Sequence, residues 1–419
     1  MVASTDIKFY VHTNNNAPQL TNNYGCMLDV LDATMLNGVQ VGTVNSLTAS
    51  GKIVTAVFST AHNLLQYQVI KITGANQTEY NIEARVLTVP NTTTITFELV
   101  ANPSVMTATG TINCSLPPLG WEKPFSSTSA TGGKGAYRSK NLLLPSRPFL
   151  RVVDELDPAY TASYAKYAKV GIVEDMTDID TLLGAQTPYD SNAPTKNWVG
   201  AGSGTSAING WAKWYYATGG IESNTISKTT TPSNGNRAWI IVGNSEGFYI
   251  LNKAHHIVNE KFCIYGVGIL NNLSKIGALP YFLAASNDYS PAANTLVVGY
   301  SALTTTRSNQ FVFMLRNYKA QAIMSLASSR ALCNSVADYC GYTPSFVAPD
   351  SDISVFSSVY LIAENSNIPR GTVPILRWLY QLKPYNHLQT LSESGRMLLA
   401  CSCVSFDYDG QILIDLGGL

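Results

Sequence analysis

The sequence contains few charged residues, and their charges cancel. Asp, Glu, Lys and Arg make up 13% of the 419 residues, and 27 basic side chains balance 27 acidic ones. Ordinary soluble domains contain about 25% charged residues. A neutral chain lacks the basic surface that general nucleic-acid binding requires, so we expect no nucleic-acid partner. A neutral, weakly charged protein tends to associate, which indicates that assembly is its normal state.

Long apolar runs are also absent. The longest, Phe262–Leu270 and Ala278–Ala285, have the length of core strands, whereas about 18 apolar residues are needed to span a bilayer. The first residues lack the basic start and apolar core of a secretory signal. We therefore expect neither a targeting segment nor a membrane partner.

Residue patterns that carry reaction chemistry are scarce. There is no G-x-x-x-x-G-K-[ST] phosphate loop, and Gly266-Val267-Gly268 lacks the third glycine of a dinucleotide-binding turn. The adjacent His255 and His256 point in different directions on a strand or a helix, so they are poorly placed to bind one metal ion. We therefore expect no catalytic residue, no cofactor and no metal site, and a protein that is not an enzyme.

Two groups of carboxylates leave alternatives open. Asp154, Glu155 and Asp157 have the residue types of a glycosidase acid/base pair, although aspartates at a strand end are the ordinary interpretation. Glu174–Asp180 supplies the oxygen ligands that calcium prefers. This run lacks the glycine and the final glutamate of a calcium-binding loop, so we favour a solvated strand end.

The cysteines do not predict a disulfide framework. There are seven, an odd number at irregular spacing, and most lie inside apolar runs. Such residues are typical of reduced thiols in the core of a protein made in a reducing cytoplasm.

Short alternating runs bounded by turn residues are abundant. Four lie between residues 46 and 112, at Ile53–Phe58, Val69–Thr73, Ile82–Val89 and Thr94–Leu99. Alternation of apolar and polar residues with a period of two predicts half-buried strands. We therefore predict a small inserted β-barrel domain over residues 46–112, which Pro117 and Pro118 end.

The remaining residues predict a mainly β fold with a few helices. Residues 1–45 contain a helix from Tyr24 to Leu36, stopped by Asn37-Gly38, and pack with the main body. Residues 113–419 form that body, a β-rich sandwich or barrel. Its strands, and one near the N-terminus, are predicted at Ile7–His12, Phe149–Val153, Ala168–Val173, Trp239–Val242, Phe248–Leu251, Phe262–Leu270, Leu296–Tyr300, Phe311–Leu315, Val359–Ala363, Met397–Phe406 and Gln411–Leu416.

Two segments of the body have helical features. The Ala- and Ser-rich stretch Ala320–Asp338 predicts a helix that ends before Cys340-Gly341. Asp157–Tyr167 carries three tyrosines at helical spacing, but the same residues also fit an extended strand, so both structures stay open.

One cluster of aromatic residues is a candidate contact surface. Aromatic side chains can stack on sugars or anchor protein interfaces, and packing in the core is the alternative. The candidate interface or glycan-contact residues are Trp198, Trp211, Trp214, Tyr215 and Tyr216.

Several blocks, taken in order, resemble tailed-bacteriophage virion proteins of the tail or structural type. The residues that carry the resemblance are Ala17–Leu20 (APQL), Met35–Gly38 (MLNG), Gly120–Phe125 (GWEKPF), Tyr137–Ser139, Leu150–Val152, Glu174–Asp180 (EDMTDID), Trp239–Gly243 and Gly410–Asp415 (GQILID). The block at 46–112, with Ala61–Leu64 and Ile70–Gly74, resembles a small β module inserted in many phage tail and fibre proteins. The resemblance implies a structural role in the virion and supplies no catalytic residues.

The sequence thus favours a structural component of a bacteriophage virion, in the tail, the neck or the baseplate. Such a protein works by forming a homo-oligomer and by docking onto other virion proteins. It is assembled in the bacterial host cytoplasm and is located in the virion. A capsid decoration or head-fibre protein and an adhesin that binds host glycans are the alternatives.

Overall fold

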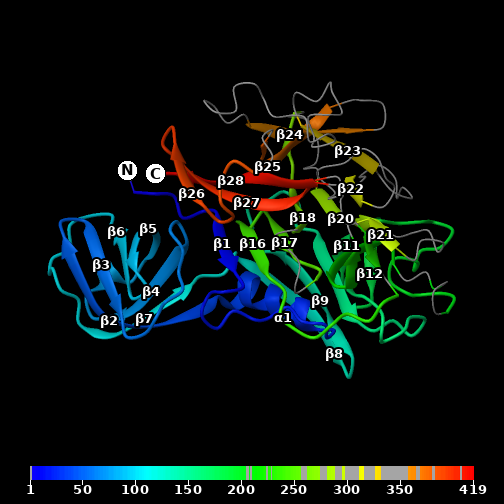
Figure 1. The fold of residues 1–419 in the computed structure, drawn as a ribbon, viewed down its shortest axis with the longest axis horizontal. Coiled ribbons are helices and arrows are strands. Elements are labelled where there is room, and N and C mark those ends of the chain that lie inside the picture. Colours follow the sequence, from blue (N-terminus) through cyan, green and yellow to red (C-terminus); the bar gives the residue numbers. More distant parts are fainter. Residues whose placement is uncertain are drawn as a thin grey trace.

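The computed structural model describes residues 2–203, 207, 210–222, 225–227, 229–255, 262–273, 281–287, 295–297, 311–315, 326–331, 357–364, 369–379, 383–405 and 408–419. Over these residues the protein is mainly β, with one α-helix, one π-helical turn and one 3-10 turn. Figure 1 shows a small barrel at one end of a larger body of curled sheets. The mainly β fold with a small inserted barrel, predicted from the sequence, is confirmed.

The small barrel is closed and antiparallel. Its strands follow the order β2 (Val39–Ser50), β3 (Ile53–Phe58), β6 (Thr94–Glu98), β5 (Glu83–Asn91), β4 (Val69–Ala75) and β7 (Gly110–Leu116). The strands alternate between buried and less buried residues, because one face fills the barrel and the other meets solvent. The four runs predicted in this region coincide with β3, β4, β5 and β6. The barrel begins before and ends after the predicted module 46–112, whose status as a separate domain stays a prediction.

Two glycines allow the backbones of β4 and β7 to approach closely. Gly74 has a φ of +84°, and a Cβ atom there would lie 2.0 Å from the carbonyl oxygen of Thr111. Gly110 has a φ of +121°, and its Cβ atom would lie 2.3 Å from the carbonyl oxygen of Gly74. Only glycine fits both the space and the backbone conformation. The pairing of β4 with β7, which closes the barrel, therefore depends on these two residues.

The barrel is fixed to the body through Arg85 on β5. This side chain is 2% exposed. Its guanidinium donates hydrogen bonds to the carbonyl oxygens of Ser4, Tyr67 and Leu416, at 2.8 Å for Tyr67 and 3.0 Å for Leu416. Ser4 and Leu416 lie near the two ends of the chain, so one barrel residue ties the barrel to both.

A second polar contact lies where the barrel meets the body. The amides of Asn14 and Gln68 form a reciprocal pair at 3.0 and 2.9 Å, and Gln68 also donates to the carbonyl oxygen of Phe9. One continuous cluster of buried apolar residues extends from the barrel into the body. The barrel is therefore held in a fixed position, with its base built into the main core.

The body consists of antiparallel strands in one extended, curled sheet. One run of paired strands comprises β1 (Lys8–Val11), β16 (Trp239–Asn244), β17 (Gly247–Asn252), β18 (Cys263–Ile269), β20 (Tyr281–Asn287), β22 (Phe311–Leu315), β23 (Leu326–Ala331), β24 (Ser357–Glu364), β25 (Pro369–Leu379), β28 (Tyr408–Gly418), β27 (Arg396–Ser405) and β26 (Thr390–Glu393). A second comprises β8 (Trp121–Ser129), β9 (Gly132–Ser139), β10 (Phe149–Glu155), β11 (Lys166–Met176), β12 (Leu182–Thr187) and β13 (Ala212–Ala217), and β13 joins it to β20. Short strands are β14 (Gly219–Glu222), β15 (Thr225–Ser227), β19 (Asn271–Asn272) and β21 (Thr295–Val297). Each strand predicted in the body overlaps one of these.

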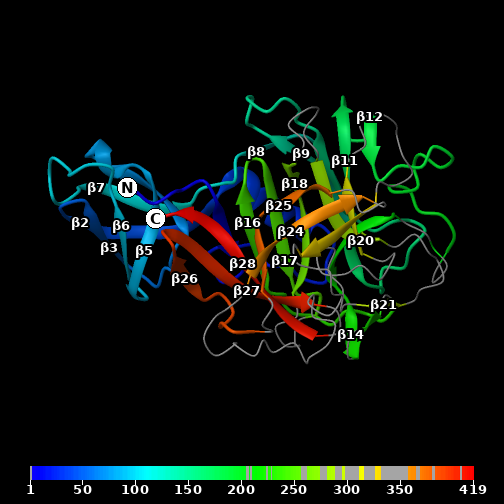
Figure 2. The ribbon, with the colours of Figure 1, turned by 90° about the horizontal axis from the view of Figure 1, so that it is seen from above.

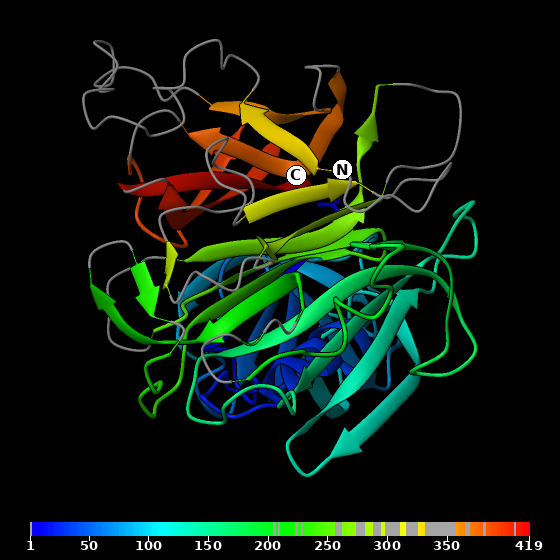
Figure 3. The ribbon, with the colours of Figure 1, turned by 90° about the vertical axis from the view of Figure 1, so that its right-hand side faces the viewer.

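The C-terminal strands cover one side of the sheet. Figure 3 shows β25 to β28, orange to red, as a layer over the green strands of the central sheet. Figure 2 shows the barrel protruding from one end of the body. Both chain ends lie near the place where the barrel joins the body. The backbone N–H of Ser4 donates a 2.9 Å hydrogen bond to the carbonyl oxygen of Gly418. The two ends of the chain are thus hydrogen-bonded to each other.

The predicted helix near the N-terminus is present as two helical segments. α1 (Cys26–Leu31) continues into a π-helical segment, η1 (Asp32–Asn37), and the apolar face of both is buried against the sheet. A 3-10 turn, η2 (Thr78–Tyr80), lies in the barrel. Gly38 follows η1 and has a φ of +76°. This positive φ agrees with the helix stop that the sequence predicts at Asn37-Gly38.

One predicted helix of the body differs from the structure where its residues are described, the rest of Ala320–Asp338 lying outside the described residues, and the segment left open is neither of its two alternatives. Within Ala320–Asp338, the described residues 326–331 form β23, so the predicted helix is wrong there. β23 pairs with β22 and β24, and these pairings override local helix preference. Asp157–Tyr167 is neither a helix nor a long strand, because turns precede β11, which begins at Lys166. Its tyrosines pack edge to face with ring centroids 5.4 Å apart.

Candidate functional site

The five predicted aromatic contact residues are buried in the described structure. Trp198 is 8% exposed, Trp211 is 3% exposed, and Trp214, Tyr215 and Tyr216 are completely buried. The last three follow one another on β13, and the structure places Trp198 in a separate apolar cluster. A role for these five residues in an interface or in glycan contact stays a prediction, and it would require a rearrangement that exposes them.

Most of these aromatic residues have partners inside the protein. The indole of Trp214 donates a 3.0 Å hydrogen bond to the carbonyl oxygen of Ala284 and stacks on Tyr265. The indole of Trp198 donates to Gln186, and the guanidinium of Arg151 lies 4.5 Å from the centre of its ring. These contacts are those of core residues that position polar groups.

Asp154, the last buried residue of β10, caps helix α1. Its Oδ2 atom accepts hydrogen bonds from the backbone N–H groups of Gly25 and Met27, at 2.9 and 3.0 Å. Its Oδ1 atom accepts a 2.6 Å hydrogen bond from the hydroxyl of Tyr216. Burial raises the pKa of Asp154 to about 7, although these donors act to lower it. The carboxyl group therefore holds the helix start against the sheet.

The other carboxylates considered in the sequence are also paired. Asp157 forms a 2.7 Å ion pair with Lys169, and both side chains are 3% exposed. Glu155 lies 3.8 Å from Lys134. Asp180, in the acidic run, binds both Lys134 and Arg151. Among the described residues no group of three or more His, Cys, Asp or Glu side chains is arranged to hold a metal ion.

One segment matches a nucleophile motif by spacing alone. Gly243–Gly247 reads G-x-S-x-G, with Ser245 at the position of the nucleophile. That motif needs a sharp turn from a strand to a helix. Here the residues form the hairpin turn between β16 and β17, and Glu246 donates its N–H to the Asn244 side chain at 2.9 Å. Ser245 therefore lacks the setting of a nucleophile.

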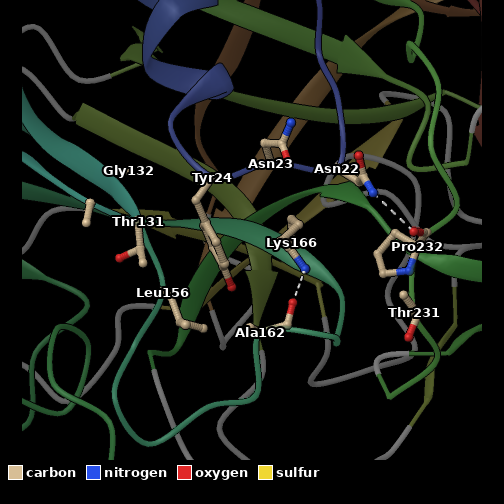
Figure 4. A pocket seen from close by; sticks show the side chains of 11 residues that line it. Asn22, Asn23, Tyr24, Thr131, Gly132, Leu156, Ala162, Lys166, Thr231 and Pro232 are labelled. Atoms are coloured by element: carbon tan, nitrogen blue, oxygen red, sulfur yellow. Dashed lines mark hydrogen bonds between the residues drawn. The ribbon is translucent and has the colours of Figure 1, made fainter.

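A pocket of about 500 Å³ opens where the chain before α1 faces the turn between β8 and β9 and the residue after β10. Such a volume is in the range of about 300–1,000 Å³ that is typical of small-ligand sites. Figure 4 shows its wall, with the ring of Tyr24 projecting between Thr131 and Lys166. The residues that define its character are Asn22, Tyr24, Thr131, Lys166, Thr231 and Pro232.

Lys166 is the charged group of this pocket. It is 7% exposed, and its ammonium donates hydrogen bonds to the carbonyl oxygens of Ala162 and Tyr164, at 2.7 and 2.6 Å. Among the described residues no carboxylate pairs with it. Burial lowers the pKa of Lys166, and repulsion from Arg237 lowers it further. The sequence did not single out Lys166 or Tyr24, because no local pattern distinguishes them.

A second surface feature lies at the end of the barrel that faces away from the body. Ile53, Val100, Val105 and Met106 are 42%, 72%, 48% and 50% exposed there. The tip of the β2–β3 hairpin fixes this loop: the N–H of Ala49 donates to the carbonyl oxygen of Met106, and the carbonyl oxygen of Lys52 accepts from the N–H of Leu99, next to Val100. We call these four residues the barrel tip.

Over the described residues, the fold and these sites define a mainly β protein with an inserted barrel and a polar pocket. No family model matches the chain, and no curated protein matches it. Among solved structures, the phage phi92 endosialidase matches with 9% sequence identity and a TM-score of 0.16. The match covers 91% of this chain and 52% of that chain, so this chain spans about half the length of that protein. At this TM-score the likeness carries no argument about function. Among the described residues, no helix has the length and apolar character to cross a membrane.

Proposed function

We propose that the protein is a structural component of a bacteriophage virion, located in the tail, the neck or the baseplate. It works by self-association and by docking onto other virion proteins. The observation that carries this proposal is the barrel tip, a set of exposed apolar side chains held away from the body on a fixed support. The ordered sequence blocks that resemble tail-type virion proteins support the assignment to a bacteriophage particle.

The barrel tip has the character of a contact surface. Single exposed apolar residues are normal, but four of them on one hairpin tip and the adjoining loop of a protein with few charges favour association. Val100 is the most exposed of the four, and its neighbours Val105 and Met106 share the same loop. Burial of such side chains contributes about 25 cal/mol per Å² of apolar surface. In a particle with many copies, contacts of modest strength add together.

The fixed attachment of the barrel supports this interpretation. A module on a flexible linker loses conformational entropy when it docks, whereas a preorganised surface does not. Arg85 and the Asn14–Gln68 pair fix the barrel base. The paired carboxylates around Asp154 and Asp157 further favour a structural protein over an enzyme.

Separation of virus particles into heads and tails tests the proposal. Quantitative mass spectrometry of the two fractions should place this chain with tails, necks or baseplates. Recovery of the chain with heads would instead support a capsid decoration or head-fibre protein. Absence of the chain from purified particles would contradict a structural role altogether.

Charge substitutions test whether the barrel tip is the docking surface. V100D with M106D should reduce incorporation into particles at least about tenfold, because a docked carboxylate must be desolvated. The matched control is L142D with L143D, two exposed apolar residues of the body that are 77% and 92% exposed. Normal incorporation of the tip variant, with the barrel still folded, would show that the barrel tip is not the docking surface.

A further inference from the structure

The pocket beside helix α1 contains a buried cation without an anionic partner. Lys166 lies at the start of β11, and its ammonium carries three donor hydrogens. Two of these are used by the carbonyl oxygens of Ala162 and Tyr164. The nitrogen also lies 5.4 Å from the centre of the Tyr24 ring, and among the described residues no third oxygen accepts a hydrogen bond from it. Buried ammonium groups are normally paired, because taking a charge out of water is costly.

The charges around the pocket leave it electropositive. Arg237 is completely buried nearby, and its guanidinium donates to the carbonyl oxygens of Gly235 and Ser233 and to no carboxylate among the described residues. Of the nearest carboxyl groups, Asp157 is neutralised by Lys169, and Asp154 is enclosed by its own donors. An anion in the pocket would therefore meet the ammonium of Lys166, and no carboxylate is among the described residues that line the pocket.

Hydroxyl groups complete the polar lining. Thr131 and Thr231 are exposed, and in Figure 4 they lie on opposite sides of Lys166. Neither hydroxyl has a hydrogen-bond partner among the described residues. The ring of Tyr24 forms a wall, and its own hydroxyl is buried without a partner. The lining thus offers one cation, several hydroxyl groups and one aromatic face.

We propose that this pocket binds a small carboxylate-bearing ligand that also carries hydroxyl groups, such as an acidic monosaccharide. The carboxylate accepts a hydrogen bond from Lys166, and the ligand hydroxyls bind Thr131 and Thr231. A single compact ammonium suits a monoanion, whereas a phosphate dianion is typically held by several backbone N–H groups or by arginine forks. The inference does not depend on a role in the virion.

Isothermal titration of the full chain with four probes tests the proposal. Glucuronate should bind, while glucose, which has the same ring without the carboxylate, should bind at least about tenfold more weakly. Acetate should bind more weakly than glucuronate because it lacks the hydroxyl groups. Equal affinities for acetate and glucuronate would identify a bare carboxylate as the ligand. Binding of glucose equal to that of glucuronate, tighter binding of phosphate, or no binding by any probe would overturn the proposal.

Variants locate the binding to the pocket. K166M should abolish the preference for glucuronate over glucose. T131V with T231V should weaken glucuronate several-fold and leave acetate unchanged; these residues are exposed, so this variant decides the question if K166M fails to fold. T128V is the matched control, since Thr128 is exposed on β8 and does not line the pocket. Unchanged glucuronate binding in both the lysine and the threonine variants would contradict the assignment.

Discussion

The hydroxyl of Tyr216 donates a 2.6 Å hydrogen bond to the Oδ1 atom of Asp154, and both side chains are completely buried. Tyr216 belongs to β13 and Asp154 to β10, while the other oxygen of the same carboxyl caps α1. One carboxyl group therefore joins two strands and a helix. Substitution of such a group affects the whole interior, because each of its three donors would lose its acceptor.

The raised pKa of Asp154 predicts a specific pH dependence of stability. The pKa is about 7 in the folded protein, whereas an exposed aspartate has a pKa of about 3.9. Between these values the folded state binds more protons than the unfolded state, so the free energy of unfolding falls as pH rises. The contribution of Asp154 to the free energy of unfolding is fully present below about pH 4 and is lost as pH rises through about 7. The total loss is at most about 4 kcal/mol.

Urea unfolding at several values between pH 4 and pH 8 measures this effect. D154N has no titrating group at this position, so its stability should lack this part of the pH slope, while all other titrating groups contribute equally to both proteins. Parallel pH profiles of the two proteins would show that Asp154 does not titrate as the structure indicates.

Arg85 should contribute more to stability than an arginine in an exposed ion pair. R85A leaves three carbonyl oxygens at the barrel base without donors, and each such loss costs about 1–3 kcal/mol. Arg396, which is 51% exposed and pairs with Asp415, is the matched control, and R396A should cost less than about 1 kcal/mol. Urea unfolding gives both values, and limited proteolysis should show faster cleavage near the chain ends in R85A alone. Equal costs would contradict the bracing role of Arg85.

Gly74 should tolerate no side chain. G74A adds a Cβ atom 2.0 Å from the carbonyl oxygen of Thr111, so β4 and β7 must separate. Gly395 is the matched control, because its φ is +73° but no atom lies within 4 Å of the added Cβ. G395A should cost about 1–2 kcal/mol from backbone strain alone. G74A should lower the thermal stability clearly more than G395A does. Equal losses would show that β4 and β7 can move apart to accommodate the added Cβ atom.

Trp214 distinguishes core packing from glycan contact in the predicted aromatic cluster. W214A removes a completely buried side chain, so it should lower the free energy of unfolding by about 3–5 kcal/mol. W214F retains much of the volume and should cost less. Loss of binding to host cells in W214A, with unchanged thermal stability, would favour the glycan interpretation.

The strands were accessible from the sequence because their signals are local. The alternation at Ile53–Phe58 and the apolar run at Phe248–Leu251 are each contained within a few residues. The helix predicted over Ala320–Asp338 failed where β23 forms, since pairing with two neighbouring strands outweighs local preference. Aromatic residues near Trp211 were recognised as a group, but a one-dimensional pattern does not distinguish a buried cluster from an exposed one.

The sequence by itself determined the low charge, the strand-rich fold and the inserted barrel, because composition, alternation and turn residues act over short stretches of chain. Only the tertiary structure decided that Asp154 caps a helix, that Arg85 braces the barrel and that Lys166 lies in a pocket without a carboxylate. These roles join segments far apart in the chain. They arise from long-range packing, in which the partner of a buried charge is fixed by the arrangement of the strands and not by its neighbours in sequence.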